Sequence, residues 1–117
     1  MSVTKNNRAT GSIYEEKIAA FLKQNGFLIL ERNYRCKQGE IDIIARDGRY
    51  LVFIEVKFRA TGSTGFSLEA IDHRKAARIR NAALYYLFSH RLSEETPCRF
   101  DAAGIDGETI TYIKNAF

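Results

Sequence analysis

Four charged residues lie within two runs of sequence that otherwise have the composition of buried β-strands. Glu40 and Asp42 belong to EIDIIA, and Glu55 and Lys57 belong to YLVFIEVKF. Carboxylates held close together repel and raise each other's pKa, and a divalent cation removes both effects. Hard oxygen ligands suit Mg²⁺ or Mn²⁺ rather than zinc. A nearby ammonium can orient or deprotonate a water, or stabilise charge developing on a phosphate, so these residue types predict metal-assisted hydrolysis of a phosphodiester.

The two runs are joined by an Asp-Gly dipeptide, which is typical of a β-hairpin. With a loop of two or four residues, we expect Asp42 to face Phe53. The same register places Glu40 opposite Glu55 and makes Asp42 and Glu55 diagonal neighbours on one face with Lys57. The opposite face is then apolar: Ile41, Ile43, Val52, Ile54 and Val56. The alternative interpretation is a solvated sheet face with cross-strand Glu–Lys pairs.

A third carboxylate is predicted on the inward face of a helix. This helix runs from Ser12 or Ile13 to Asn25 and stops at Gly26. Glu15 lies three, four and seven positions before apolar residues of the packed face, whereas the next residue, Glu16, is rotated toward solvent. A carboxylate on the core side needs a partner or a metal. The alternative is a first-turn acid that favours the helix dipole.

A second long helix, predicted over Leu68–Leu92 with a break near Asp72, begins with several basic residues. The apolar residues of this helix are spaced so that they form a buried stripe: Ile79, Ala82, Ala83, Tyr86 and Leu87. Lys75 precedes Ile79 by four positions and therefore lies on the packed face. It is either a phosphate contact or a lysine whose stem covers apolar surface while its ammonium stays in water. Arg78 and Arg80 are expected to be solvated or to bind a nucleic-acid backbone.

Two further groups of residues have a chemical and a structural interpretation. Asp101 is either an acid that supports the site or an ordinary charge at the end of a strand, and we prefer the second. Phe53, Phe58 and Phe66 are able to stack on bases, although Phe53 and Phe58 are more typical of a core.

The remaining elements complete a single α/β domain. FLILERNYR is a strand, KQG a turn, RATGSTG a flexible loop, and RFDAAGI with TITYI a final hairpin around Asp106-Gly107. The order helix, three strands, helix, strands predicts a central mixed β-sheet flanked by an N-terminal helix and a long helix after the third strand. We expect residues 1–12 to form a flexible tail and residues 13–117 to form one domain.

Composition limits the classes of protein to which the chain can belong. Its net charge of +4 and pI near 9.2 are compatible with a polyanionic partner without requiring one. Cys36 and Cys98 lie far apart, and neither His73 nor His90 has ligand spacing to them, so we expect a reduced compartment and no zinc site. The first residues, MSVTKNNRATGS, contain no apolar run typical of a signal peptide, and no later run approaches spanning length, so we expect a cytoplasmic, soluble protein without a membrane partner.

Two sequence patterns resemble known families. Asp42 followed by Glu55-Val56-Lys57, with an acid on the preceding helix, resembles the D…E-x-K core of the restriction-endonuclease-like superfamily. The blocks YEEKIAAFLKQNGFLILERNYR, GEIDIIARDG, LVFIEVKFR, GFSLEAIDHRK and CRFDAAGI, in this order, resemble the YraN-like family of uncharacterised bacterial proteins.

The resemblance implies a restriction-endonuclease-like core of the Holliday-junction-resolvase type. It implies Asp42 and Glu55 as metal ligands, Lys57 as the catalytic lysine and Glu15 as the helix acid. Tyr14 stands where the family has a small residue, which leaves Glu16 as the alternative helix acid. Glu40 matches the family block but receives no role. We expect nucleic-acid contacts from basic residues that flank this site: Arg59, Arg74, Lys75 and Arg78.

These expectations favour a Mg²⁺- or Mn²⁺-dependent DNA endonuclease, selective for junction-like DNA. The alternative is a non-catalytic nucleic-acid-binding module that retains the nuclease fold, and a third interpretation is a scaffold that binds only proteins. A homodimer would supply the two active sites that a resolvase-like protein needs to cut two strands. Fold alone does not decide among these functions.

Overall fold

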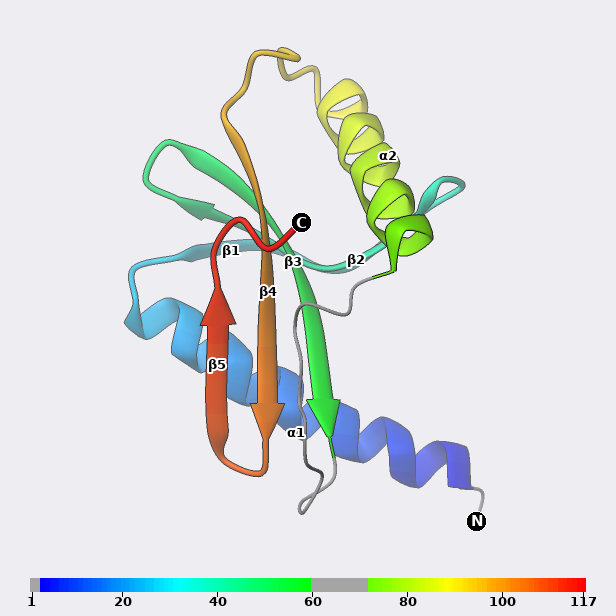
Figure 1. The fold of residues 1–117 in the computed structure, drawn as a ribbon, viewed down its shortest axis with the longest axis vertical. Helices are drawn as coiled ribbons and strands as arrows, with labels where there is room; N and C mark the ends of the chain where they lie inside the picture. The colour runs from blue at the N-terminus through cyan, green and yellow to red at the C-terminus, as the bar shows by residue number, and fades with distance from the viewer. Residues whose placement is uncertain (1–2, 60–71) are drawn as a thin grey trace.

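The computed structural model describes residues 3–59 and 72–117, and the side chains of residues 13–57 and 72–117. In these residues the elements are α1 (Val3–Gln24), β1 (Leu28–Cys36), β2 (Gly39–Asp47), β3 (Tyr50–Arg59), α2 (His73–Ser89), β4 (Cys98–Asp106) and β5 (Thr109–Ile113). The strands form one five-stranded sheet in the order β1-β2-β3-β4-β5 (Figure 1). β3 and β4 are parallel, and the other neighbouring pairs are antiparallel. The predicted α/β class, mixed sheet and final hairpin are confirmed.

The first helix is longer at its N-terminus than the sequence predicted. It begins at Val3 rather than at Ser12 or Ile13, and it therefore includes residues expected to form a flexible tail. The prediction followed the apolar stripe that begins near Tyr14, but helical hydrogen bonds do not require a packed stripe and no proline interrupts this segment. The C-terminal stop is as predicted, because Gly26 adopts a positive φ of 86° directly after the helix.

The second helix begins where the sequence predicted a break. Asp72 is its N-cap, and the Asp72 carboxylate accepts a hydrogen bond of 2.8 Å from the backbone N–H of Arg74. The predicted start at Leu68, the loop after Arg59 and the aromatic Phe66 lie outside the described residues. The predicted buried stripe is confirmed: Ile79, Ala82, Ala83, Tyr86 and Leu87.

Two apolar cores lie on opposite faces of the sheet. On one face Ile18 and Leu22 of α1 pack with Val52 and Ile54 of β3. On the other face the buried stripe of α2 packs with strand residues that include Leu51 and Phe53. Alternate residues of β3 therefore belong to different layers, as the period of a β-strand requires. Phe53 is fully buried, so it serves the core; the side chain of Phe58 lies outside the described residues.

The register of the β2–β3 hairpin differs from the predicted register by two positions. Phe53 pairs with Ile44 rather than with Asp42, and Asp47 pairs with Tyr50. The loop consists of Gly48 and Arg49 alone, and the φ of 62° at Gly48 suits the tight turn. The predicted pairs belong to a four-residue loop. A shift of two positions leaves every side chain on its predicted face of this ladder.

The prediction that Ile41 lies on the same apolar face as Ile43 was also wrong. This residue packs in the core beneath α2, whereas Ile43 packs in the core beneath α1. The last printed pair of the β2–β3 ladder is Ile43–Ile54, and beyond it β2 curves away toward α2 while staying paired with β1 (Figure 1). Strict alternation fails at Ile41 because the strand leaves the plane of β3 there.

Both cysteines are free thiols, and both histidines are exposed. Neither of the helices in the described residues has the length and apolar character needed to cross a membrane.

Candidate functional site

The divergence of β2 from β3 positions Asp42. Asp42 lies one residue beyond the last pair of the ladder, so the backbone N–H of Val56 is not used by β2. The Asp42 Oδ2 atom accepts a hydrogen bond of 2.8 Å from this N–H. The hydrogen bond fixes the carboxylate at the edge of β3, directly beside Glu55.

Glu55 is almost fully buried on the α2 side of the sheet. It follows Leu51 and Phe53 at the two-residue period of β3, and its exposed fraction is 4%. Ala102, its partner on the parallel strand β4, has only a methyl side chain and leaves space above the sheet. A buried carboxylate is costly unless a cation or hydrogen bond compensates it.

The two carboxylates are close enough to perturb each other. Burial and the negative charge of Glu55 raise the pKa of Asp42 to about 7, although the hydrogen bond from Val56 acts in the opposite direction. Hydrogen bonding with Glu55 also favours the protonated form of Asp42. Asp42 is therefore partly protonated near neutral pH, which is the behaviour of a carboxylate pair that lacks sufficient positive charge.

Lys75 supplies the positive charge present in the site. Its ammonium forms an ion pair with the buried Oε2 of Glu55 from the first turn of α2. Burial alone would lower the pKa of Lys75, but the hydrogen bond and charge of Glu55, together with Asp42 and Glu40, raise it. The Lys75 side chain is 47% exposed, so it reaches the pair from solvent and can leave again without unfolding the helix.

Lys57 shares the face of Glu55, two residues along β3. It is half-buried and pairs across the parallel ladder with Gly104, which has no side chain to cover it. Among the described side chains it has no ion-pair partner, in contrast to Lys75. Without such a partner in the described residues, its ammonium is available to an anionic ligand on this face of the sheet.

Glu15 belongs to the helix on the other face of the sheet. Its side chain is half-buried, and its negative charge helps to raise the pKa of Arg32 on β1. Glu16 points to solvent and forms a 2.6 Å ion pair with the same arginine, as expected for the exposed position. Within the described part of the chain, no three His, Cys, Asp or Glu side chains form a group able to hold a metal ion. The role of Glu15 as a third ligand stays a prediction.

The predicted nucleic-acid contacts have different surroundings. Lys75 pairs with Glu55, Arg74 is exposed in the first turn of α2, and Arg78 lines an open groove described below. Arg80 lies over the ring of Phe100 at 4.7 Å from its centroid. The backbone of Arg59 pairs with Asp106, and its side chain lies outside the described residues.

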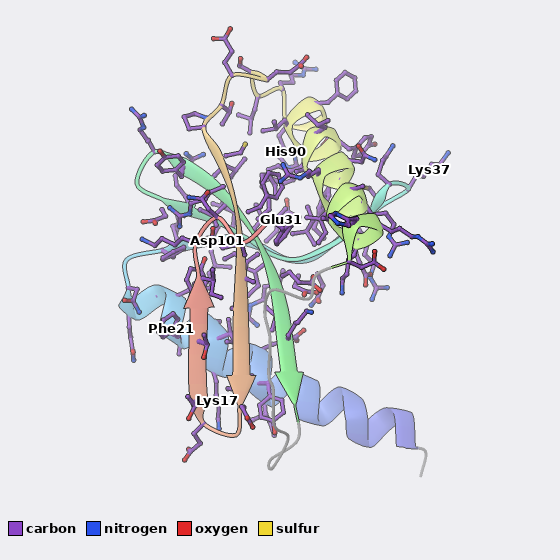
Figure 2. The ribbon with its side chains drawn as sticks, in the orientation of Figure 1. Lys17, Phe21, Glu31, Lys37, His90 and Asp101 are labelled. Carbon is purple, nitrogen blue, oxygen red and sulfur yellow. The ribbon has the colours of Figure 1, made fainter. Side chains whose placement is uncertain are left out.

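A second buried charge cluster is the feature that sequence reasoning missed most clearly. Asp101 is fully buried on β4 (Figure 2). It accepts hydrogen bonds from Arg99 at 2.9–3.0 Å and from the Tyr112 hydroxyl at 2.5 Å. Arg99 also reaches Asp47 at 2.9 Å. Asp101 pairs with Ile54 and thus shares the α1 face, so it is neither an ordinary strand-end charge nor a neighbour of Glu55. The alternation of Arg99 and Asp101 was the available signal.

Comparison with known proteins identifies the family. Residues 14–105 match the family described as "Uncharacterised protein family UPF0102". A UPF0102 protein of Lachnoclostridium phytofermentans is 51% identical, covering 96% of this chain and 95% of the relative. Similar relatives occur in Moorella thermoacetica, at 46% identity over 88% of this chain and 85% of the relative, and in Legionella pneumophila, at 41% over 92% of each. The chain therefore belongs to family UPF0102, the family that its sequence blocks identified as YraN-like.

Proposed function

We propose that this protein is a divalent-cation-dependent DNA endonuclease with a restriction-endonuclease-like core. The observation that carries the proposal is the pair Asp42 and Glu55, two converging carboxylates beside a buried strand edge, compensated by one lysine. Such a pair has the hard oxygen donors that Mg²⁺ and Mn²⁺ prefer. Lys57 beside it completes the D…E-x-K pattern.

The residues of the pair fit a divalent cation for a physical reason. Burial and the negative charge of Glu55 raise the pKa of Asp42, and the ammonium of Lys75 offsets only part of this effect. Asp42 would lose its proton on holding the cation together with Glu55, and the cation would supply positive charge at the phosphate undergoing hydrolysis. The hydrogen bond from Val56 keeps Asp42 oriented, so little reorganisation is needed.

Lys57 and Lys75 would have different duties. The ammonium of Lys57 would orient the attacking water or stabilise charge developing on the phosphate. Lys75 would release Glu55 and turn its half-exposed ammonium toward the phosphate backbone of the substrate. The site thus has one lysine for the chemistry and another that compensates the carboxylates until substrate arrives.

The test is cleavage of junction, flap and single-stranded DNA by purified protein with Mg²⁺ or Mn²⁺. Asp42→Ala, Glu55→Ala and Lys57→Ala should each abolish cleavage. Glu94→Ala, which removes an exposed carboxylate, should cleave as the wild type does. Cleavage that persists in Asp42→Ala protein would come from a contaminant and would remove the case for this site.

A second candidate function is a nucleic-acid-binding module without catalysis. The Lys75–Glu55 ion pair favours it, because the fold compensates its buried carboxylate without any metal. This candidate predicts DNA binding that weakens with salt and no metal-dependent cleavage. Calorimetric titration of wild-type and Asp42→Ala protein with Mg²⁺ or Mn²⁺ separates the two, because only the nuclease requires cation binding that depends on Asp42.

A further inference from the structure

The tip of the β1–β2 hairpin packs closely against α2. At Gly39 an added Cβ would lie 3.3 Å from both the Cβ and the carbonyl oxygen of Arg78, and the φ of Gly39 is 154°. Glycine permits this approach because it has no side chain and tolerates positive φ. The contact sets the hairpin and the helix as two walls of one groove.

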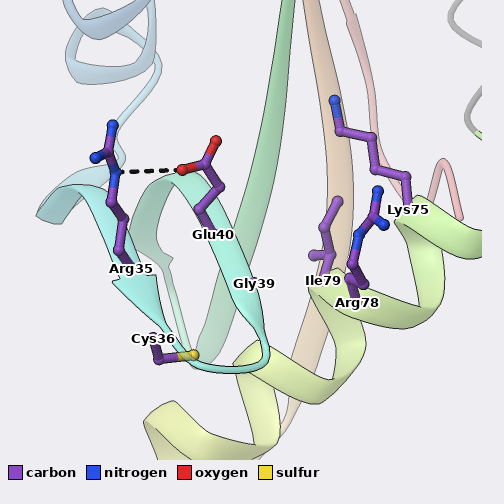
Figure 3. Close-up of a pocket in the computed structure, with 7 residues that line it drawn as sticks. All are labelled: Arg35, Cys36, Gly39, Glu40, Lys75, Arg78 and Ile79. Atoms are coloured by element: carbon purple, nitrogen blue, oxygen red, sulfur yellow. Dashed lines mark ion pairs between the residues drawn. The ribbon is translucent and has the colours of Figure 1, made fainter.

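The groove has a volume of about 490 Å³ and is connected to the carboxylate pair through Lys75. It is lined by Arg35, Cys36, Gly39, Glu40, Lys75, Arg78 and Ile79 (Figure 3). Lys75 both lines the groove and contacts Glu55, so a ligand seated here would lie next to the proposed site of hydrolysis. The volume falls within the range of sites that bind small ligands or parts of larger ones.

Arg35 and Arg78 line the groove from the hairpin and from α2 respectively. Arg78 has no ion-pair partner among the described side chains. Arg35 pairs with Glu40 at 3.2 Å, but both side chains are largely exposed, with exposed fractions of 78% and 64%. An ion pair of this kind contributes little to stability, so Arg35 can exchange Glu40 for another anion. Figure 3 shows Glu40, Lys75 and Arg78 projecting toward the same side of the groove.

The charge of α2 is unfavourable for the helix itself. Its first turn contains His73, Arg74 and Lys75 and no acidic residue, although the positive end of the helix dipole lies there. Neighbouring Arg78 adds to the same region. The Asp72 carboxylate caps this end and Lys75 compensates Glu55, but neither contact uses Arg78. A cation left without a carboxylate partner among the described side chains is typical of a binding surface. An anion in the groove would remove this repulsion.

We propose that the groove between the β1–β2 hairpin and α2 binds a backbone phosphate of the nucleic acid adjacent to the phosphate being hydrolysed, through Arg78 and Arg35. Glu40 is the residue that holds Arg35 in the absence of nucleic acid. This assignment rests on the proposed function and gives Glu40 the role that the sequence left open. Arginine suits the duty because its planar fork contacts two phosphate oxygens at once.

The experiment measures binding rather than cleavage. Affinity for a labelled DNA duplex is measured by fluorescence anisotropy over a series of salt concentrations, with EDTA present. Loss of one phosphate contact should lower the magnitude of the slope of log K against log salt by about 1. We expect this loss in Arg78→Ala and in Arg35→Ala, and tighter binding in Glu40→Gln because Arg35 is released and a repelling charge is removed.

Lys23→Ala is the matched control, since it removes one exposed cation from α1 on the other face of the sheet. It should keep the wild-type slope. The inference is overturned if Arg78→Ala and Arg35→Ala also keep that slope, or if the wild type does not bind DNA. If binding depends on Arg78 and Arg35 but no Mg²⁺-dependent cleavage occurs, the groove is a phosphate site and the proposed nuclease activity is wrong. If cleavage occurs but the slopes do not change, the nuclease activity stands and the groove assignment is wrong.

Discussion

The perturbed ionisation of Asp42 predicts that Asp42→Asn stabilises the protein in the absence of metal. The pKa of Asp42 is raised from 3.8 to about 7 in the folded state. Between these values the folded state binds more protons than the unfolded state, so stability falls as pH rises through this range. An asparagine does not ionise, and its side-chain oxygen can still accept the hydrogen bond from Val56.

The magnitude follows from the size of the shift. About three pKa units correspond to about 4 kcal/mol of unfavourable free energy once Asp42 is ionised. Because the side chain is only half-buried, water screens part of this cost. We therefore expect Asp42→Asn to be about 2 kcal/mol more stable than the wild type near pH 8, and nearly equal to it below about pH 4.

Urea unfolding in EDTA over this pH range measures the difference directly. Glu94→Gln, at an exposed carboxylate, provides a control whose stability difference should not depend on pH in this way. At about pH 8, saturating Mg²⁺ should make the wild type more stable than Asp42→Asn, because the ion stabilises only a folded state that binds it. A difference between Asp42→Asn and wild type that is independent of pH, or a less stable variant at about pH 8, would refute the electrostatic account.

Three other substitutions test separate parts of the structure by urea unfolding. Lys75→Met should lower the free energy of unfolding by about 1–2 kcal/mol in EDTA, because the buried carboxylate of Glu55 loses its cation. Mg²⁺ should then stabilise this variant more than it stabilises the wild type, and equal stabilisation would contradict the role of the lysine. Gly39→Ala should lower the free energy of unfolding by about 1–2 kcal/mol more than Gly48→Ala does, because both positions have positive φ but only Gly39 contacts α2. Equal losses of stability would contradict the close contact between Gly39 and α2. Arg99→Met should lower the free energy of unfolding by about 3–5 kcal/mol, because buried Asp101 loses its cationic partner. A loss of stability below about 1 kcal/mol would show that the network is dispensable.

The sequence predicted the element order because each element had a local signal. The Asp-Gly turns, the glycine after α1 and the apolar stripe of α2 all act over a few residues. The proximity of Asp42 and Glu55 followed from the period of a strand, which a register error of two positions does not change. The exact register could not follow, since two-residue and four-residue loops leave the same alternation.

The features that escaped prediction depend on distant segments. Ile41 changes face because β2 curves toward a helix that follows much later in the chain. Lys75 and Glu55 form their ion pair only because α2 lies over the end of β3, and their spacing in the sequence does not predict this contact. The groove requires the fit of Gly39 against Arg78, which no pattern within either element indicates.

The parallel pairing of β3 with β4 has a consequence for the order of folding. β1, β2 and β3 are joined by short turns, whereas β4 can pair only after the chain from Arg59 to Cys98 has crossed over. Contacts between distant segments form more slowly, so the three-stranded meander should assemble before α2 and β4. Asp42 and Glu55 then approach each other before Lys75 arrives to compensate them. The part of the pH dependence of stability that comes from the charge of Glu55 should consequently lie in the refolding rate, and the part that comes from burial beneath α2 in the unfolding rate.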